Sequence, residues 1–160
     1  MKVIDFTYAC ILTAIIVAIE VIAAITGELI VALTMVSALP IYLICRRSIA
    51  LGITSYICVS LILLQINPHQ LIFFIFTNGL LGISLGFCDK KTKLATISIL
   101  ISSTMLFIGI IITAYIIGIS IVKWYIGIYV FSCIYSALYR FIARKSHTKL
   151  SKIEIFLSGK

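Results

Sequence analysis

The sequence predicts an all-α membrane protein, a bundle of about six transmembrane helices with both termini on the cytoplasmic side. Of its 160 residues, 62% are hydrophobic and 11% are charged, whereas soluble domains are about 45–50% apolar and about 25% charged. Long apolar runs alternate with short polar segments, and Lys and Arg gather in alternate polar segments. Lipid is therefore the expected solvent for most of this surface.

Six segments are long and apolar enough to be predicted as spans. Crossing the hydrocarbon core takes about 20 residues, because a helix rises about 1.5 Å per residue. In chain order, the segments are Phe6–Ile25, Leu29–Cys45, Ser48–Leu64, Gln70–Cys88, Leu94–Ile117 and Ile119–Ile142. The second and third are short and are separated clearly only by Arg46 and Arg47, which leaves a bent or re-entrant arrangement open. The fifth and sixth are separated weakly, around Gly118, Ser120 and Lys123.

The two ends of the chain complete this organisation. The first apolar run continues to about Ile25 without a small-residue cleavage site, so a retained span is expected rather than a signal peptide. Residues 1–145 are predicted to form the transmembrane domain, and residues 146–160 a basic cytoplasmic tail. This tail is partly apolar, so it is expected either to lie on the inner leaflet as a short amphipathic helix or to fray.

The distribution of positive charge predicts the orientation. The first, third and fifth connections contain only one basic residue, Lys123, out of the 13 Lys and Arg residues of the chain. All the others lie before the first span, in the second and fourth connections, or from Arg140 onward. Cytoplasmic loops carry the Lys and Arg excess, so both termini are expected inside. Merging two spans would place large basic patches on opposite sides, which favours six.

Composition and motifs exclude several classes of function. The net charge of +8 comes from residues at span ends, and no basic face interleaved with aromatics predicts nucleic-acid binding. The chain has no HExxH, GxSxG or GxxxxGK[ST] motif and no paired carboxylates, so neither an enzyme, a metal site nor a cofactor is expected. The five cysteines form no CxxC pair and are interpreted as small buried hydrophobic residues.

Glu20 is the one formal charge well inside a predicted span. It lies about six residues from the outer end of the first helix, roughly 9 Å deep. An intramembrane carboxylate is costly, and it marks a candidate functional site. The alternative is a Glu that is protonated or hydrogen-bonded to a neighbouring helix.

Polar and aromatic residues near the predicted outer side form a second candidate site. Asn67, His69 and Gln70 flank the third connection, and Asn78 lies about two turns into the fourth span. Small-molecule pockets are mostly apolar with a few placed polar groups. Trp124 and Tyr125 at the fifth connection complete the expected set of ligand contacts. The alternatives are interfacial anchoring for the aromatic residues and helix–helix hydrogen bonding for Asn78.

Small residues recur at helical spacing in two spans. Cys10, Ala14 and Ala18 follow one another at intervals of four in the first span, and Gly82 and Gly86 form GxxxG in the fourth. Such faces let helices approach closely. Packing within the bundle is one expectation, and docking of a partner on the first helix is the other.

Six short spans, both ends inside and the motif Ala14-x-x-x-Ala18 in the first helix together resemble the substrate-binding S components of energy-coupling factor (ECF) transporters. Two further segments are similar to such proteins, Ala38–Tyr42 and Asn78–Gly82. The resemblance covers most of the chain as architecture.

The resemblance implies uptake of a vitamin-like small molecule across a plasma membrane of bacterial type. Ligand would bind near the outer surface, at Asn67, His69, Gln70, Asn78, Trp124 and Tyr125, with Glu20 facing a cationic or hydrogen-bond-donating group. Ala14 and Ala18 would dock a transmembrane coupling protein, and two cytoplasmic ATPases would drive reorientation of the bundle. Apart from these partners, the ligand and the lipid bilayer, no other partner is expected.

Two further interpretations remain open. A membrane scaffold similar to the rod-shape-determining MreD family has the same size and span count, although the Pro-Asp typical of that family is not found here. A small immunity or resistance membrane protein would need no pocket at all. Neither alternative requires a tightly bound ligand.

Overall fold

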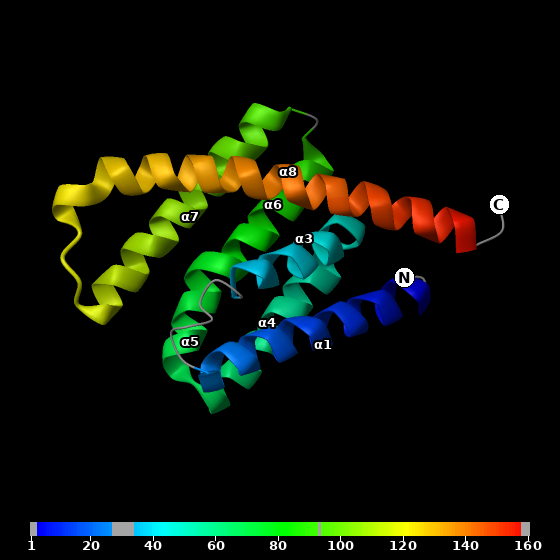
Figure 1. Ribbon diagram of the computed structural model, residues 1–160, viewed down its shortest axis with the longest axis horizontal. Coiled ribbons are helices and arrows are strands. Elements are labelled where there is room, and N and C mark those ends of the chain that lie inside the picture. Colours follow the sequence, from blue (N-terminus) through cyan, green and yellow to red (C-terminus); the bar gives the residue numbers. More distant parts are fainter. Residues whose placement is uncertain (1–2, 27–33, 93, 158–160) are drawn as a thin grey trace.

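The computed structural model describes residues 3–26, 34–92 and 94–157, with side chains described as far as Lys149 except at Val122. This part of the chain is helical and contains no strand. Figure 1 shows long helices crossing one another in a bundle, with one shorter helix at its centre.

Five helices are long and apolar enough to cross a membrane. They are α1 (Val3–Thr26), α4 (Ile49–Ile66), the stretch Pro68–Lys91, α7 (Ala95–Ile117) and α8 (Tyr125–Leu157). The third of them consists of α5 (Pro68–Phe73), a π-helical turn η3 (Phe74–Gly79) and α6 (Leu80–Lys91). The predicted all-α membrane fold is confirmed, and the chain is a multi-pass membrane protein.

The second predicted span, Leu29–Cys45, takes a different form in its described part. A 3₁₀ turn, η2 (Met35–Ser37), leads into α3 (Ala38–Arg47), which has only 10 residues. Such a helix is about 15 Å long, half the thickness of the hydrocarbon core. Residues 29–33 of the predicted span lie outside the described residues, so a sixth complete span stays a prediction.

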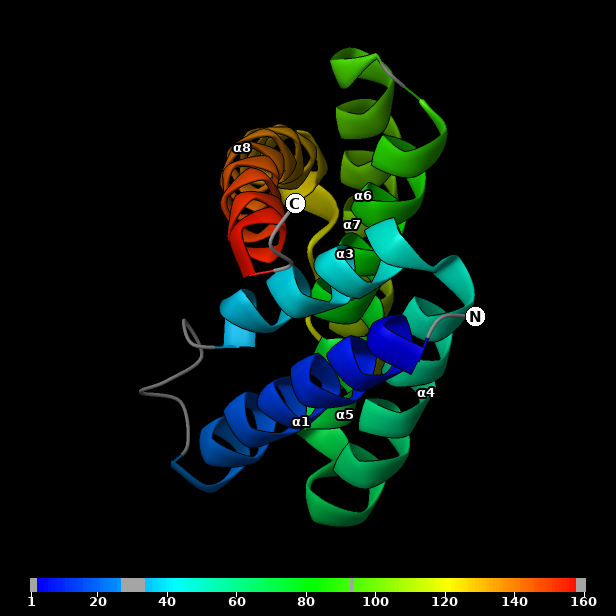
Figure 2. The same ribbon diagram turned by 90° about the vertical axis from the view of Figure 1, so that its right-hand side faces the viewer.

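α3 is the most enclosed helix of the bundle. Ile41, Tyr42 and Cys45 have no exposed surface, and the whole run from Ile41 to Cys45 is buried. Figures 1 and 2 both place α3 between α1 on one side and α8 on the other. Pro40 is tolerated because it lies in the first turn, where its missing N–H has no helical partner to lose. An apolar run that sequence analysis assigns to lipid therefore forms the protein's own core.

Glycines bring α6 against α3. A Cβ atom at Gly82 would lie 2.7 Å from the carbonyl oxygen of Ala38, and one at Gly86 would lie 2.5 Å from Cβ of Cys45. Real Cβ atoms do not approach so closely, so only glycine fits at both places. The GxxxG spacing thus serves packing within the molecule, which was one of its two expected uses.

The chain runs back and forth between two ends of the bundle. Arg47 at the end of α3 lies 3.6 Å from Asp5 near the start of α1, and its carbonyl accepts a hydrogen bond from Lys90 at the end of α6. The start of α1 and the end of α8 lie at this same end in Figure 1. Basic residues therefore gather at one end, as the charge pattern predicts. Which end faces the cytoplasm stays a prediction.

α8 continues through the predicted domain boundary at residue 146. It is a single helix of 33 residues, from Tyr125 to Leu157. Neither Gly nor Pro follows Gly127 within α8, so no helix-breaking residue interrupts it before Leu157. The predicted tail is thus the end of the last helix within the described residues.

Candidate functional site

A cavity of about 420 Å³ opens at the end of the bundle opposite the basic residues. Its walls come from the end of α1, η2, α5, η3, α7 and α8. It is lined by Ala23, Ala24, Thr34, Met35, Asn67, His69, Gln70, Phe73, Thr77, Asn78, Leu106, Ile110, Phe131 and Tyr135. We call it the α5 cavity. Its size falls within the range of about 300–1,000 Å³ that is typical of small-molecule sites.

Asn67 fixes the polar rim of the α5 cavity. Its side-chain oxygen accepts hydrogen bonds from the backbone N–H of His69 (3.0 Å) and of Gln70 (3.2 Å), which caps the start of α5. Pro68 follows at the first helical position, where its fixed φ angle favours the helix. The short segment Asn-Pro-His-Gln therefore turns the chain sharply and places His69 and Gln70 in the first turn, at the cavity.

Glu20 lies behind Gln70. The side-chain nitrogen Nε2 of Gln70 donates a hydrogen bond of 2.7 Å to Oε2 of Glu20. Glu20 is fully buried, and its other oxygen, Oε1, has no hydrogen-bond partner among the described residues. No Lys or Arg is among the residues that line the cavity. Among the described residues, Glu20 has the only carboxyl group near this end of the bundle. It does not line the cavity itself but is hydrogen-bonded to the side-chain amide of Gln70, which does.

Asn78 enters the cavity from the π-helical turn η3. Its side chain is 7% exposed, and the turn is braced by Tyr56, whose hydroxyl donates to the carbonyl of Ile75 at 3.2 Å. Tyr56 also stacks on Phe74, with ring centroids 5.7 Å apart. A π turn inserts an extra residue into a helix and often occurs at functional sites. This turn helps to set the direction in which Thr77 and Asn78 face.

Trp124 and Tyr125 do not line the α5 cavity. Trp124 is 70% exposed, and Tyr125 makes an edge contact with Phe107 at a centroid distance of 6.4 Å. Trp124 is the last residue of the 3₁₀ turn η4 (Val122–Trp124), and Tyr125 is the first residue of α8. The structure therefore brings together Asn67, His69, Gln70 and Asn78, adds Glu20 behind them, and places the two aromatic residues elsewhere.

Other wall residues were missed by sequence reasoning. Phe131 and Tyr135 of α8 stack on each other at 6.0 Å, and Leu106 and Ile110 come from α7. They belong to long, mostly apolar runs, in which nothing distinguishes a residue that faces a cavity from one that faces lipid. The hydroxyl of Tyr135 was no signal either, because Ser132, Ser136 and Tyr139 lie in the same stretch.

Ala14 and Ala18 line a second hollow, on the outer face of the bundle. This groove, with a volume of about 660 Å³, lies between α1 and α4 and is almost wholly apolar. Cys10, Thr54 and Cys58 contribute further small side chains to its wall. We call it the α1–α4 groove. Thr13 and Ser55 close its floor, because the Thr13 hydroxyl donates to the Ser55 hydroxyl at 2.8 Å.

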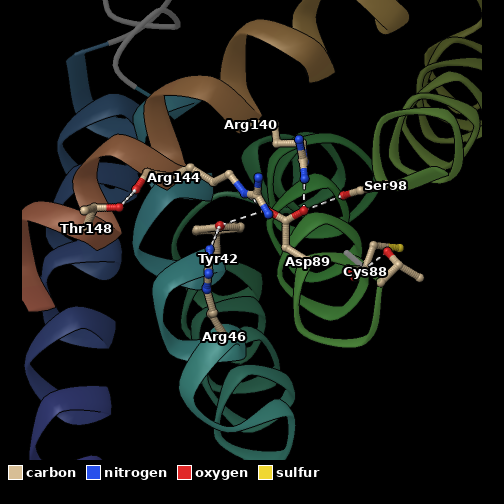
Figure 3. Close-up of polar contacts among 9 residues, drawn as sticks. Tyr42, Arg46, Cys88, Asp89, Ser98, Arg140, Arg144 and Thr148 are labelled. Carbon is tan, nitrogen blue, oxygen red and sulfur yellow. Dashed lines mark hydrogen bonds and ion pairs between the residues drawn. The ribbon is translucent and has the colours of Figure 1, made fainter. Parts of the chain in front are cut away.

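A cluster of polar and charged side chains lies at the basic end of the bundle, and Figure 3 shows it in close-up. Its centre is Asp89 at the end of α6, and its other members are Tyr42, Arg46, Ser98, Arg140 and Arg144. We call it the Asp89 cluster. It joins α3, α6, α7 and α8 through side chains alone. Sequence reasoning did not pair Asp89 with any of these residues, because most of its partners lie far away along the chain.

No protein family, curated protein or solved structure matches this chain. The arrangement of its own residues is therefore the basis for a functional conclusion.

Proposed function

We propose that this chain is the membrane-embedded binding subunit of an uptake system for a vitamin-like small molecule. The observation that supports this best is the α5 cavity, where polar side chains from α5 and η3 meet apolar walls from four other elements. A chain that served only as a scaffold or an immunity protein would have no need of such a cavity.

The lining favours a neutral or positively charged ligand. Amide groups of Asn67, Gln70 and Asn78 can both donate and accept hydrogen bonds, and the walls offer aromatic faces from Phe73 and Phe131. Neither Lys nor Arg is present among the lining residues to bind an anionic group. The buried carboxyl group of Glu20 favours a ligand with a cationic or hydrogen-bond-donating group on the same side.

Transport itself would need partners. The chain carries no phosphate-cradling loop, so energy would come from two cytoplasmic ATPases acting through a transmembrane coupling protein. The α1–α4 groove supports this part of the proposal, because small residues along α1 allow a partner helix to approach closely. The proposed location is the plasma membrane of a bacterial cell, with the α5 cavity facing outward.

Mass spectrometry of the purified protein tests the proposal directly. The protein is purified in mild detergent from cells grown in rich medium and denatured, and the released small molecules are identified. We expect one compound in stoichiometric amount. The variant Asn78→Leu, which fills the cavity wall with an apolar side chain, should lose the compound, whereas Gln65→Ala on the exposed side of α4 should retain it. Repeated absence of any compound from a monodisperse wild-type sample would refute the proposal.

A further inference from the structure

The carboxylate of Asp89 is saturated by its own neighbours. Oδ1 accepts from Arg140 Nε at 2.7 Å and from the Ser98 hydroxyl at 2.9 Å. Oδ2 accepts from the Tyr42 hydroxyl at 3.0 Å and lies 3.3 Å from Nε of Arg144. A carboxylate offers about four lone-pair sites. Asp89 therefore has no capacity left for a further donor.

Positive charge in the Asp89 cluster exceeds what Asp89 can balance. Three guanidinium groups surround this one carboxylate, and Arg46 reaches it only through the Tyr42 hydroxyl, to which its Nη1 donates at 2.8 Å. Arg140 is 6% exposed, and its Nη2 has no partner among the described residues. The other two acidic side chains that the structure describes are occupied elsewhere, Asp5 near Arg47 and Glu20 beside Gln70.

Arg144 is partly exposed on the surface of the bundle, next to an apolar strip on α8. The side chain of Arg144 is 43% exposed, against 7% for that of Arg140. Ile134, Leu138 and Phe141 recur at intervals of four and three on α8 and are 56%, 60% and 70% exposed. Since i, i+4 and i+7 share a helix face, these side chains form an apolar strip along α8. Lys145 continues the strip, and Arg144, three positions after Phe141, borders it at one edge. A charged group therefore meets a lipid-facing surface at this point.

We propose that the Asp89 cluster binds the phosphate group of an anionic phospholipid. Arg144 and Arg46 contact the phosphate, because guanidinium groups match phosphate oxygens with two parallel donors. Arg140 and Ser98 hold Asp89 in place between them. The acyl chains lie along Ile134, Leu138 and Phe141. This site is separate from the α5 cavity, and the inference does not depend on the proposed uptake function.

Charge and position both favour a lipid over a free anion. The cluster belongs to the basic end of the bundle, and basic pockets between helices at a cytoplasmic membrane surface bind anionic headgroups. A free phosphate would gain nothing from the apolar strip beside Arg144. An anionic lipid satisfies both the surplus guanidinium donors and the exposed apolar side chains at once.

Lipid titration of the delipidated full-length protein in mild detergent tests this site. Binding of dioleoylphosphatidylglycerol, dioleoylphosphatidylcholine and inorganic phosphate is measured by native mass spectrometry. We expect phosphatidylglycerol to bind more tightly than the other two. Arg144→Gln should lower the affinity for phosphatidylglycerol about tenfold, as expected when one charge-assisted hydrogen bond is lost. Lys91→Gln makes the same change of charge at an exposed position at the end of α6, away from the strip on α8, and should change the affinity for phosphatidylglycerol less than about twofold.

Phe141→Ala tests the apolar part of the site without touching the charges. Because Phe141 is exposed, this variant is expected to keep the fold. It should weaken the binding of dioleoylphosphatidylglycerol. Binding of a dihexanoyl analogue, whose chains are too short to follow the strip, should stay nearly unchanged. The proposal is overturned if Arg144→Gln and Lys91→Gln weaken lipid binding equally, which would mean a general basic surface. It is also overturned if inorganic phosphate binds as tightly as the lipid, or if Phe141→Ala affects neither lipid.

Discussion

The side chain of Gln70 both lines the α5 cavity and bonds to Glu20. Its amide donates a hydrogen bond to the fully buried carboxyl group of Glu20. Buried polar groups cost free energy when they are left unpaired. The residue therefore couples the shape of the cavity rim to the stability of α1.

Replacing Gln70 with Ala should lower the free energy of unfolding by about 1–3 kcal/mol, because Oε2 of Glu20 then loses its donor. Thermal unfolding in detergent, followed by circular dichroism, measures the change. Gln65→Ala removes the same side chain from an exposed position of α4 and should stay within about 0.5 kcal/mol of wild type. Equal unfolding temperatures for the two variants would contradict the importance of the Glu20–Gln70 contact.

At the scale of helices, the contact between α3 and α6 depends on two glycines, which have no side chain. Gly82 and Gly86 let α6 approach the backbone of α3 more closely than any other residue would allow. α3 has only 10 residues and is nearly all buried, so it relies on this contact to stay in place.

Gly86→Ala should destabilise the protein by about 1–3 kcal/mol, because overpacking forces the two helices apart. The matched control is Gly127→Ala in α8, where an added Cβ meets nothing within 4 Å. Helix propensity favours Ala over Gly by about 1 kcal/mol, so this variant should be as stable as wild type or more stable. Chemical denaturation in mixed micelles compares the two, and a stabilised Gly86→Ala would show that α3 can be displaced at no cost.

The α1–α4 groove leads to a prediction about partners. Ala14→Leu together with Ala18→Leu should fill the groove and abolish transport, while leaving ligand binding at the α5 cavity unchanged. Uptake in cells and binding to the purified protein are measured side by side. Val3→Leu, at an exposed position of the same helix outside the groove, provides the control. Unchanged uptake by the double variant would remove the docking role from this face.

Sequence patterns predicted the lipid-facing helices well and the interior poorly. An apolar run such as that of α7 indicates only that a segment avoids water. The same run is expected for a helix in contact with lipid and for a helix buried inside the protein. α3 shows the difference, because seven of its 10 residues are buried within the protein. The residues of the cavity rim could be expected because Asn67 and Pro68 mark a turn. Asp89 and Arg140 are 51 positions apart, and only the three-dimensional packing brings them within 2.7 Å.

The whole molecule is polarised along its length, with the Asp89 cluster at one end and the α5 cavity at the other. Six passes with both termini inside would place Lys123 alone on the outer side. Five helices are long enough to span the membrane. Whether the two termini lie on the same side therefore depends on whether the segment that contains α3 makes a sixth crossing.

Cysteine labelling measures this orientation. In a background without the five native cysteines, Lys123→Cys should react with a membrane-impermeant maleimide in intact cells. Lys145→Cys should react only in inside-out vesicles, because it lies on the basic side. Both positions are exposed, so a lack of labelling cannot be due to burial. Labelling of both positions from the same side would contradict the predicted topology.

The enclosed position of α3 has a mechanical consequence. Its leading turn, η2, supplies Met35 to the wall of the α5 cavity, and its far end carries Tyr42 and Arg46 into the Asp89 cluster. One short element thus touches both ends of the molecule. A ligand whose binding required a shift of α3 would change the Tyr42–Asp89 contact, and by thermodynamic reciprocity a change in that contact would alter the affinity for such a ligand by the same factor.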